Sequence, residues 1–247
     1  MKRSGKPLFL VMALLATAPA FAGDLPHWSY SGEEGPENWG KLAQEYGLCN
    51  TGKNQSPIDL SGQIEAKLAP IQFAYATQAT EVINNGHTVQ ANFAPGSYLK
   101  VNGHEFELKQ VHFHAPSENR IDGNSYAMEG HLVHADKDGN LAVVAVMYQE
   151  GRNNRAIEKL WQQMPANAGD KVALEAGLKA GDLLPAKRDY YRFNGSLTTP
   201  PCSEGVMWLV MKHPVSAGKA QVEHFAHTMH HPNNRPIQPT NARPVLR

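Results

Sequence analysis

Alternating histidines in one short stretch constrain the fold of this chain more than any other feature. In Gln110-Val111-His112-Phe113-His114, polar or titratable residues alternate with apolar ones. Successive side chains of a β-strand point to opposite faces, so Gln110, His112 and His114 share one face. The pattern predicts a strand that carries two neighbouring imidazoles on one side and apolar side chains on the other.

A third histidine follows in a second strand-like stretch, residues 128–134, where His131 lies seventeen residues after His114. If the two strands pair, its imidazole meets the other two. Three neutral imidazoles with an open fourth position are typical of a catalytic zinc site. Gln110 and Glu129 are on the ligand faces of their strands, where such residues orient ligating rings. His134 falls on the opposite face and is not a candidate ligand.

Two alternatives to this metal site have to be considered. Histidines two residues apart in a strand are often a polar stripe that faces water, and only the third histidine with its acidic neighbour favours a metal. A rival cluster lies near the carboxyl end, with spacings of three that place its first members on one side of a helix. Without acidic partners nearby, it is better explained as a solvated face; its members are His224, His227, His230 and His231.

The composition indicates a globular chain with a substantial core. The chain has 247 residues, 41% of them hydrophobic, and equal numbers of basic and acidic side chains. It has no basic stripe or run, which argues against a nucleic-acid partner. No linker rich in Pro, Gly or Ser divides it, so we expect one domain over residues 23–247.

The first 22 residues have the features of an export signal. Lys2, Arg3 and Lys6 form a positive region, an apolar run follows, and Ala20-Phe21-Ala22 fits a signal-peptidase site. A retained membrane anchor is the alternative, but the apolar run is short for a bilayer. We therefore expect a signal peptide over residues 1–22, no anchor after cleavage, and a periplasmic protein, with secretion outside the cell as the other destination.

Both cysteines, Cys49 and Cys202, lie in the expected mature part. In an oxidising compartment an even count favours one disulfide, which would close a loop of about 150 residues. Two buried free thiols are the alternative. No CxxC spacing supports zinc binding by these residues.

Short β-type runs dominate the rest of the chain. Asn102-Gly103 between two alternating runs predicts a hairpin. The continuously apolar run over residues 141–148 predicts a strand buried on both faces. Helical spacing over residues 154–164 predicts a helix that ends before Pro165, and a second short helix is expected over residues 222–230. Residues 28–46 contain too many Gly and Pro for us to expect regular structure.

Eight stretches, in the same order, resemble the α-class carbonic anhydrases over nearly the whole expected mature length. They are His27-Trp28-Ser29-Tyr30, Gly35-Pro36-Glu37-Asn38-Trp39, Gln55-Ser56-Pro57-Ile58-Asp59, Asn84-Asn85-Gly86-His87, His112-Phe113-His114 with Pro116-Ser117-Glu118, Glu129-Gly130-His131-Leu132-Val133-His134, residues 191–202, and Asn233-Asn234-Arg235-Pro236.

The resemblance implies a mainly β, single-domain fold. Its large central sheet would be twisted and mostly antiparallel, with about ten strands, short helices and long loops around it, and zinc at the base of a conical cleft. It also implies a zinc lyase that hydrates carbon dioxide reversibly to bicarbonate and a proton, through a zinc-bound hydroxide and a histidine proton shuttle. The leader and the cysteine pair are similar to those of exported bacterial members.

Residue roles follow from the same resemblance. His112, His114 and His131 look like the ligands of one Zn²⁺ per chain, with Gln110 and Glu129 as their hydrogen-bond partners. Thr198 looks like the residue whose hydroxyl donates to Glu118 and accepts from the hydroxide, and Thr199 like a bicarbonate contact. Without the resemblance, the two threonines would be explained equally well by a turn before Pro200-Pro201.

The remaining roles concern the cleft. Val133, Val143, Leu197 and Trp208 resemble the apolar pocket for carbon dioxide, although each could equally be ordinary core. His87 resembles the proton shuttle, a role that suits an imidazole because it titrates near neutrality, with a turn histidine as the alternative. Tyr30 matches a residue that orders water in the cleft.

Two other classes of function remain as alternatives. A binding protein on the same scaffold would typically lack one or more ligands, and all three are present here. A zinc-buffering protein would use the carboxy-terminal histidines and bind several ions per chain. The resemblance is compatible with a homodimer, for which the sequence shows no interface.

Overall fold

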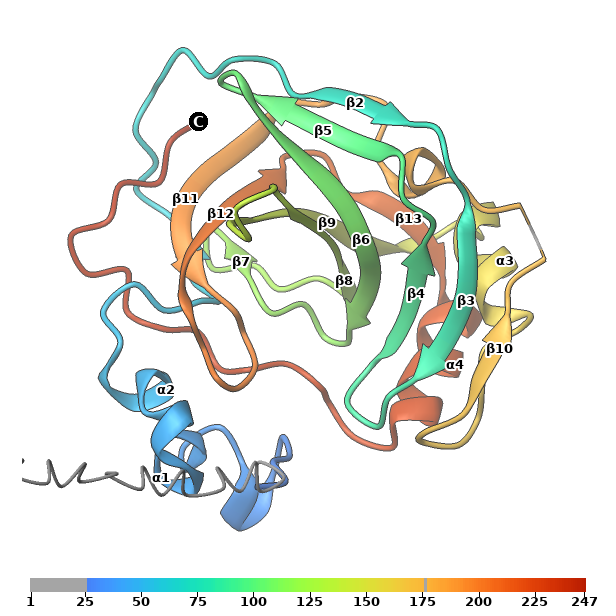
Figure 1. Ribbon diagram of the computed structural model, residues 1–247, viewed down its shortest axis with the longest axis horizontal. Coiled ribbons are helices and arrows are strands. Elements are labelled where there is room, and N and C mark those ends of the chain that lie inside the picture. The colour runs from blue at the N-terminus through green and yellow to red at the C-terminus, as the bar shows by residue number, and fades with distance from the viewer. Residues whose placement is uncertain (1–25, 176) are drawn as a thin grey trace, which may run out of the picture.

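One large sheet organises the computed structural model, which describes residues 26–175 and 177–247 (Figure 1). The expected signal peptide lies outside the described residues. Along its main path the strand order is β10-β3-β4-β6-β8-β9-β12-β11. In addition, β5 pairs with β6, β2 pairs with β5, and β13 pairs with β9. The eleven strands are β2 (Gln72–Tyr75), β3 (Ala79–Asn84), β4 (Val89–Phe93), β5 (Ser97–Val101), β6 (His104–His114), β8 (Met128–Ala135), β9 (Leu141–Gly151), β10 (Lys171–Ala173), β11 (Tyr190–Ser196), β12 (Glu204–Met211) and β13 (Val215–Gly218).

The sheet is mostly antiparallel, which confirms the expected fold class. Two of its strand pairs are parallel, β12 with β9 and β13 with β9. A separate parallel pair joins β1 (Asp59–Leu60) to β7 (Arg120–Ile121). Figure 1 shows the sheet strongly curved between its edges at β11 and β10.

Local sequence explains the strands at the centre. The predicted hairpin joins β5 to β6, and Asn102 and Gly103 adopt φ of +51° and +80°, the left-handed values that such a turn requires. The residues of β9 alternate between two buried clusters, with Val144 and Val146 in one and Val143 and Ala145 in the other. The strand is therefore buried on both faces, as its apolar run predicted.

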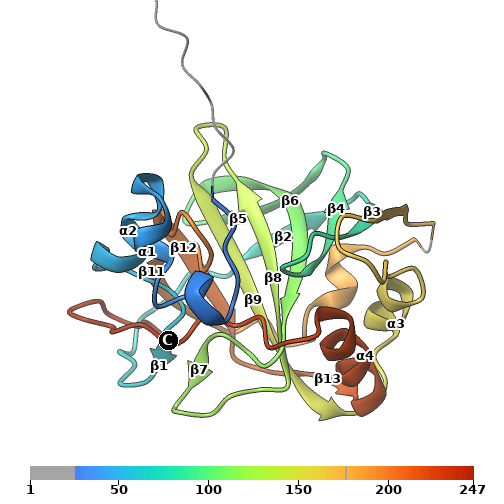
Figure 2. The same ribbon diagram turned by 90° about the horizontal axis from the view of Figure 1, so that it is seen from below.

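Short helices lie outside the sheet, with α1 and α2 on one side and α3 and α4 on the other (Figure 2). The helix predicted over residues 154–164 is shorter at both ends. Asn154 caps its start by accepting from the backbone N–H of Ala156 and Ile157, and residues 162–163 form a turn after its last residue. The second begins earlier than predicted and ends at His230, with φ of +62°. The bounds are α1 (Trp39–Leu42), α2 (Leu48–Thr51), α3 (Arg155–Trp161) and α4 (Lys219–Met229), and the 3₁₀ turns are η1 (Gly32–Glu34), η2 (Gln44–Tyr46) and η3 (Ala180–Leu183).

The expectation of no regular structure over residues 28–46 is wrong in part. That segment forms η1, α1 and η2, each of three or four residues. Helices of one turn contain too few positions to show a helical period, so the sequence could not reveal them. None of the helices in the described ranges is long and apolar enough to cross a membrane.

The predicted disulfide is confirmed, with Cys49 of α2 bonded to Cys202 at an S–S distance of 2.09 Å. Both residues are buried against Trp39 and Tyr46 in a small cluster of their own. The backbone N–H of Cys202 also donates to the carbonyl of Thr199 at 2.8 Å. The disulfide thus ties the amino-terminal segment to the turn between β11 and β12.

Removal of the disulfide is expected to destabilise the fold. The Cys49→Ser/Cys202→Ser protein should lose about 2–5 kcal/mol in the free energy of unfolding, because the bond closes a loop between residues 153 apart and restricts the unfolded chain. Urea unfolding followed by tryptophan fluorescence measures this change. Reductant should shift the midpoint of the unsubstituted protein and leave that of the double variant in place. Equal midpoints without reductant would contradict the expectation.

Candidate metal centre

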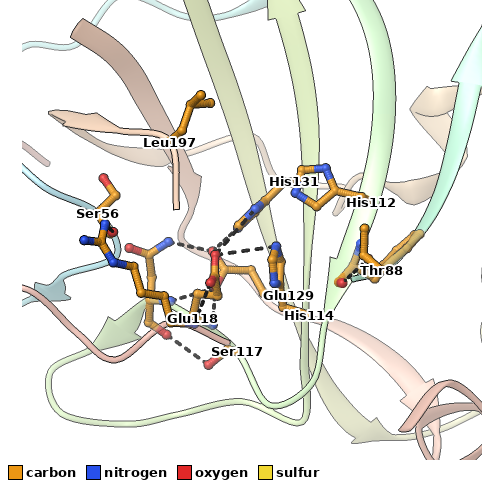
Figure 3. Close-up of polar contacts among 12 residues, drawn as sticks. Ser56, Thr88, His112, His114, Ser117, Glu118, Glu129, His131 and Leu197 are labelled. Atoms are coloured by element: carbon orange, nitrogen blue, oxygen red, sulfur yellow. Dashed lines mark hydrogen bonds and ion pairs between the residues drawn. The ribbon is translucent and has the colours of Figure 1, made fainter. Parts of the chain in front are cut away.

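Three imidazoles meet where β6 pairs with β8. In this antiparallel register His112 lies opposite His131, and His114 lies opposite Glu129. One ring nitrogen from each histidine falls within 4.8 Å of the other two. Figure 3 shows the rings gathered beside Glu118 and Glu129. The structure therefore brings together the three residues that the sequence selected.

Hydrogen bonds fix which nitrogen of two of the rings faces the centre. Nδ1 of His112 lies 2.9 Å from Oε1 of Gln110, and Nδ1 of His114 donates to the backbone carbonyl of Asn233 at 2.7 Å. In both rings Nε2 is left with a free lone pair. Gln110 thus has the position that its parity in the strand predicted.

The third ring is turned the other way. Nε2 of His131 lies 2.9 Å from Oε1 of Glu129, a charge-assisted contact rather than a well-directed hydrogen bond, so Nδ1 faces the centre. Burial lowers the pKa of His112, His114 and His131, and mutual repulsion lowers those of His112 and His131 further. Each ring is therefore neutral at physiological pH, the form that coordinates a metal.

The Glu129 carboxylate is buried but well satisfied. Its Oε2 accepts from the backbone N–H of Glu118 and of Asn119, each at 2.8 Å. Its Oε1 accepts from the Asn119 side chain at 2.7 Å. Burial raises the pKa of Glu129, and these hydrogen bonds oppose the rise. A charge so held can orient the His131 ring and raise its basicity toward a cation.

Glu118 lies beside the three histidines, within 4.0 Å of His114 and His131. Its Oε1 accepts from the backbone N–H of Arg235 at 2.8 Å. Its Oε2 lies 3.5 Å from Nε2 of His114 and 4.0 Å from Nδ1 of His131, with no hydrogen-bond partner in the described part of the chain. Burial raises the pKa of this carboxyl to about 8, and the neighbouring Thr198 side chain and the Arg235 backbone N–H oppose the rise. A cation held by the histidines would lower that pKa further.

The residues present fit a zinc ion. Nε2 of His114 and Oε2 of Glu118 are buried and unpartnered, a costly arrangement that a bound cation and its water relieve. The donor group found among the described residues consists of three histidine nitrogens, which matches an open zinc site. Within residues 26–175 and 177–247 no other group of three or more such donors is close enough to hold a metal. The carboxy-terminal histidines therefore form no second centre of this kind.

An apolar wall borders the centre. Val143 and Trp208 are buried in the cluster against which Val133 and Leu197 pack. The Trp208 ring stands edge-on to His131, with ring centroids 4.9 Å apart and planes at 80°. The four residues predicted for the carbon dioxide pocket thus lie together, on the metal-binding face of the sheet.

His87 and Tyr30 lie farther out. His87 is half-buried and stacks on Trp28, with centroids 3.8 Å apart and planes at 9°. Burial raises the pKa of Tyr30, and the negative charge of Glu118 raises it further. Thr199 is half-buried beside Thr198, which is almost fully buried.

Three residues that hold the centre were not assigned a role from the sequence. Asn233 orients His114, Asn119 holds Glu129, and Arg235 donates its backbone N–H to Glu118. The guanidinium of Arg235 is buried and donates to the carbonyls of Ser56 and Cys49. The only signal was the motif that contains Asn233 and Arg235, which shows no partner by itself.

Comparisons with known proteins agree with this geometry. The family model for eukaryotic-type carbonic anhydrase matches residues 34–247. A carbonic anhydrase of Pectobacterium carotovorum is 46% identical over 239 residues, 97% of this chain and 98% of that protein. The α-carbonic anhydrase of Thermovibrio ammonificans, solved with the inhibitor sulfanilamide, is 49% identical with a TM-score of 0.88, over 90% of this chain and 99% of that one.

A third relative leads to the same family. The α-carbonic anhydrase of Photobacterium profundum is 50% identical with a TM-score of 0.85, over 90% of this chain and all of that one. Fold, histidine cluster and sequence identity thus agree over most of the chain, which belongs to the α-class carbonic anhydrases.

Proposed function

We propose that this enzyme hydrates carbon dioxide reversibly to bicarbonate and a proton, with one zinc ion per chain held by His112, His114 and His131. The observation that carries the proposal is the cluster of three neutral imidazoles whose free nitrogens lie within 4.8 Å of one another. The relatives named above support the same reaction.

Zinc would supply the Lewis acidity that makes a bound water a nucleophile near neutral pH, as is established for carbonic anhydrases. The protein's part is to fix three nitrogens and their tautomers. Gln110, Asn233 and Glu129 do this through the contacts described above, and the ligand rings therefore need little reorganisation to bind the ion.

Glu118 and Thr198 would orient the attacking oxygen. An ionised carboxylate only accepts hydrogen bonds, so the Thr198 hydroxyl directs its proton to Glu118 and presents its lone pairs to the metal centre. The attacking oxygen then donates to Thr198 and keeps its own lone pair toward the substrate. This is catalysis by orientation, and it requires both side chains.

The substrate binds next to a dry surface. Carbon dioxide has no net dipole, and Val133, Val143, Leu197 and Trp208 offer it apolar contact and exclude water. Thr199, at the border of this wall, would contact bicarbonate through its hydroxyl.

Each turnover also releases a proton that must leave the site. His87 would accept it, because an imidazole can both take and release a proton and this half-buried ring lies near the surface. Burial lowers the pKa of His87, which favours release of the proton to the solvent. Tyr30 would order the intervening water.

The disulfide and the bacterial relatives support export to the periplasm, with residues 1–22 removed as a signal peptide and residues 23–247 forming the domain. Secretion beyond the cell would serve the disulfide equally well.

The ligand assignment predicts joint loss of metal and activity. His112→Ala and His131→Ala should each abolish stoichiometric zinc binding and lower the hydration rate by about 10³-fold or more, because two nitrogens hold the ion poorly. Metal analysis of dialysed protein and stopped-flow hydration measure both. His104→Ala, in the exposed first position of β6, is the matched control and should keep one zinc. A fully active ligand variant would refute the assignment, and zinc well above one per chain would favour a buffering protein.

The Gln110–His112 contact predicts a change in zinc affinity alone. Gln110→Ala should weaken zinc binding by about 10–100-fold while one zinc still binds at saturation, because the His112 ring loses the group that fixes its tautomer. Competition with a chelator gives the dissociation constant. Gln90→Ala is the control, since Gln90 lies opposite His112 in β4 but donates its amide to Asn92. Equal affinities of the two variants would contradict this role.

The shuttle assignment predicts a dependence on buffer. His87→Ala should lower turnover by about tenfold in dilute buffer and much less in concentrated imidazole, since a soluble base can then remove the proton. Stopped-flow hydration over a range of buffer concentrations measures this. A variant as fast as the unsubstituted enzyme in dilute buffer would count against the role.

A further inference from the structure

A further imidazole, that of His231, lies beside Tyr30 at the surface. Its ring is half-buried, and its centroid lies 6.1 Å from that of Tyr30. Nδ1 lies 3.1 Å from the carbonyl of Pro232 and donates to it, because a carbonyl can only accept. The Nε2 atom therefore carries the free lone pair.

The segment that carries His231 is fixed to the metal centre. Two residues on, Asn233 accepts from His114 through its carbonyl and donates from its side chain to the carbonyls of His87 and Phe113. Arg235 then donates to Glu118. The short segment 231–235 thus runs from the surface to Glu118, and it also holds the loop that carries His87.

Tyr30 interacts with both Glu118 and His231. The charge of Glu118 acts on its phenol, and its ring lies against the imidazole of His231. The two residues also line a surface cavity of about 420 Å³, together with Glu37 and the exposed Gly32. Water and small buffer molecules can reach His231 through this cavity.

His231 and His87 are close enough to interact electrostatically. Burial lowers the pKa of His87 first, and the positive charges that His27 and His231 can carry lower it further. The rings of His27 and His87 lie 5.8 Å apart, and Glu34 lies 3.9 Å from His27. Because like charges repel, a proton on either neighbouring ring disfavours protonation of His87.

We propose that His231 is a second proton acceptor, which works in parallel with His87 and delivers protons to the cavity beside Tyr30. The proposal rests on the proposed function. The proton released by hydration would pass through water to Nε2 of His231, and the imidazolium would give that proton to a buffer base in the cavity. The ring returns to its neutral form, and no other bond or electron is involved.

The experiment compares variants in the His87→Ala background. In dilute buffer the turnover rate of His87→Ala/His231→Gln should be lower than that of His87→Ala by a factor of about three or more. In concentrated imidazole the two rates should be equal. Glutamine keeps a polar side chain of similar reach but cannot carry a proton near neutral pH. His87→Ala/His224→Gln, with an exposed histidine of α4 replaced, is the matched control and should equal His87→Ala.

Equal rates of the two double variants in dilute buffer would overturn the proposal. A loss that persists in concentrated imidazole would also overturn it, since His231 would then act on the structure of the site. Absence of hydration by the zinc-loaded unsubstituted enzyme would refute the proposed function itself.

A measurement without turnover tests the electrostatic link. In His231→Gln, the His87 ring should titrate at higher pH than in the unsubstituted protein, as followed by NMR of the zinc-loaded enzyme, because one repelling charge is gone. The His224→Gln control should leave that titration in place. An unchanged His87 titration in His231→Gln would contradict the electrostatic link between the two rings.

Discussion

The register between β6 and β8 is the constraint on which the metal centre depends. It places His112 opposite His131 and His114 opposite Glu129. A slip by one residue would turn every side chain of β8 to the other face, and the His131 ring would leave the ligand cluster. His134 now lies behind the sheet, where its Nε2 contacts the hydroxyl of Tyr75 at 2.8 Å. Burial lowers its pKa to about 3, so that histidine stays neutral within the core.

Packing behind the sheet helps to hold this register. At Gly130 an added Cβ would come within 3.1 Å of the Phe113 ring and 3.2 Å of the Tyr148 ring. The two rings use the space that a side chain would need, and Phe113 separates the two ligands of β6 in sequence. Aromatic packing on the face opposite the metal therefore explains why a glycine stands between Glu129 and His131. Close packing there makes alternative registers costly, because any shift would bring bulk against these rings.

The part of the site that sequence could predict is the part encoded by strand parity. Gln110, Glu129 and the three ligands follow from alternation within two strands, and the continuous apolar run predicted the buried strand β9. The disulfide followed from an even cysteine count and an expected oxidising compartment. Asn233, Arg235 and His231 lie about 100 residues from the strands they serve. Their roles arise only when the chain beyond α4 returns to the sheet, and no local pattern records that path.

That returning segment couples two requirements of the enzyme. The carbonyl of Asn233 sets the orientation of a ligand, and its side chain holds the loop of His87. The metal geometry and the proton removal that we propose for His87 would therefore depend on the same few hydrogen bonds. Hydrogen-bonded groups in a dry interior are costly to leave unpaired, so the segment has little freedom to shift. A rigid connection of this kind keeps the imidazoles at the surface in constant positions relative to the metal centre. Proton transfer over several waters requires that constancy, because the donor and the acceptor must stay within reach of one continuous chain of hydrogen bonds.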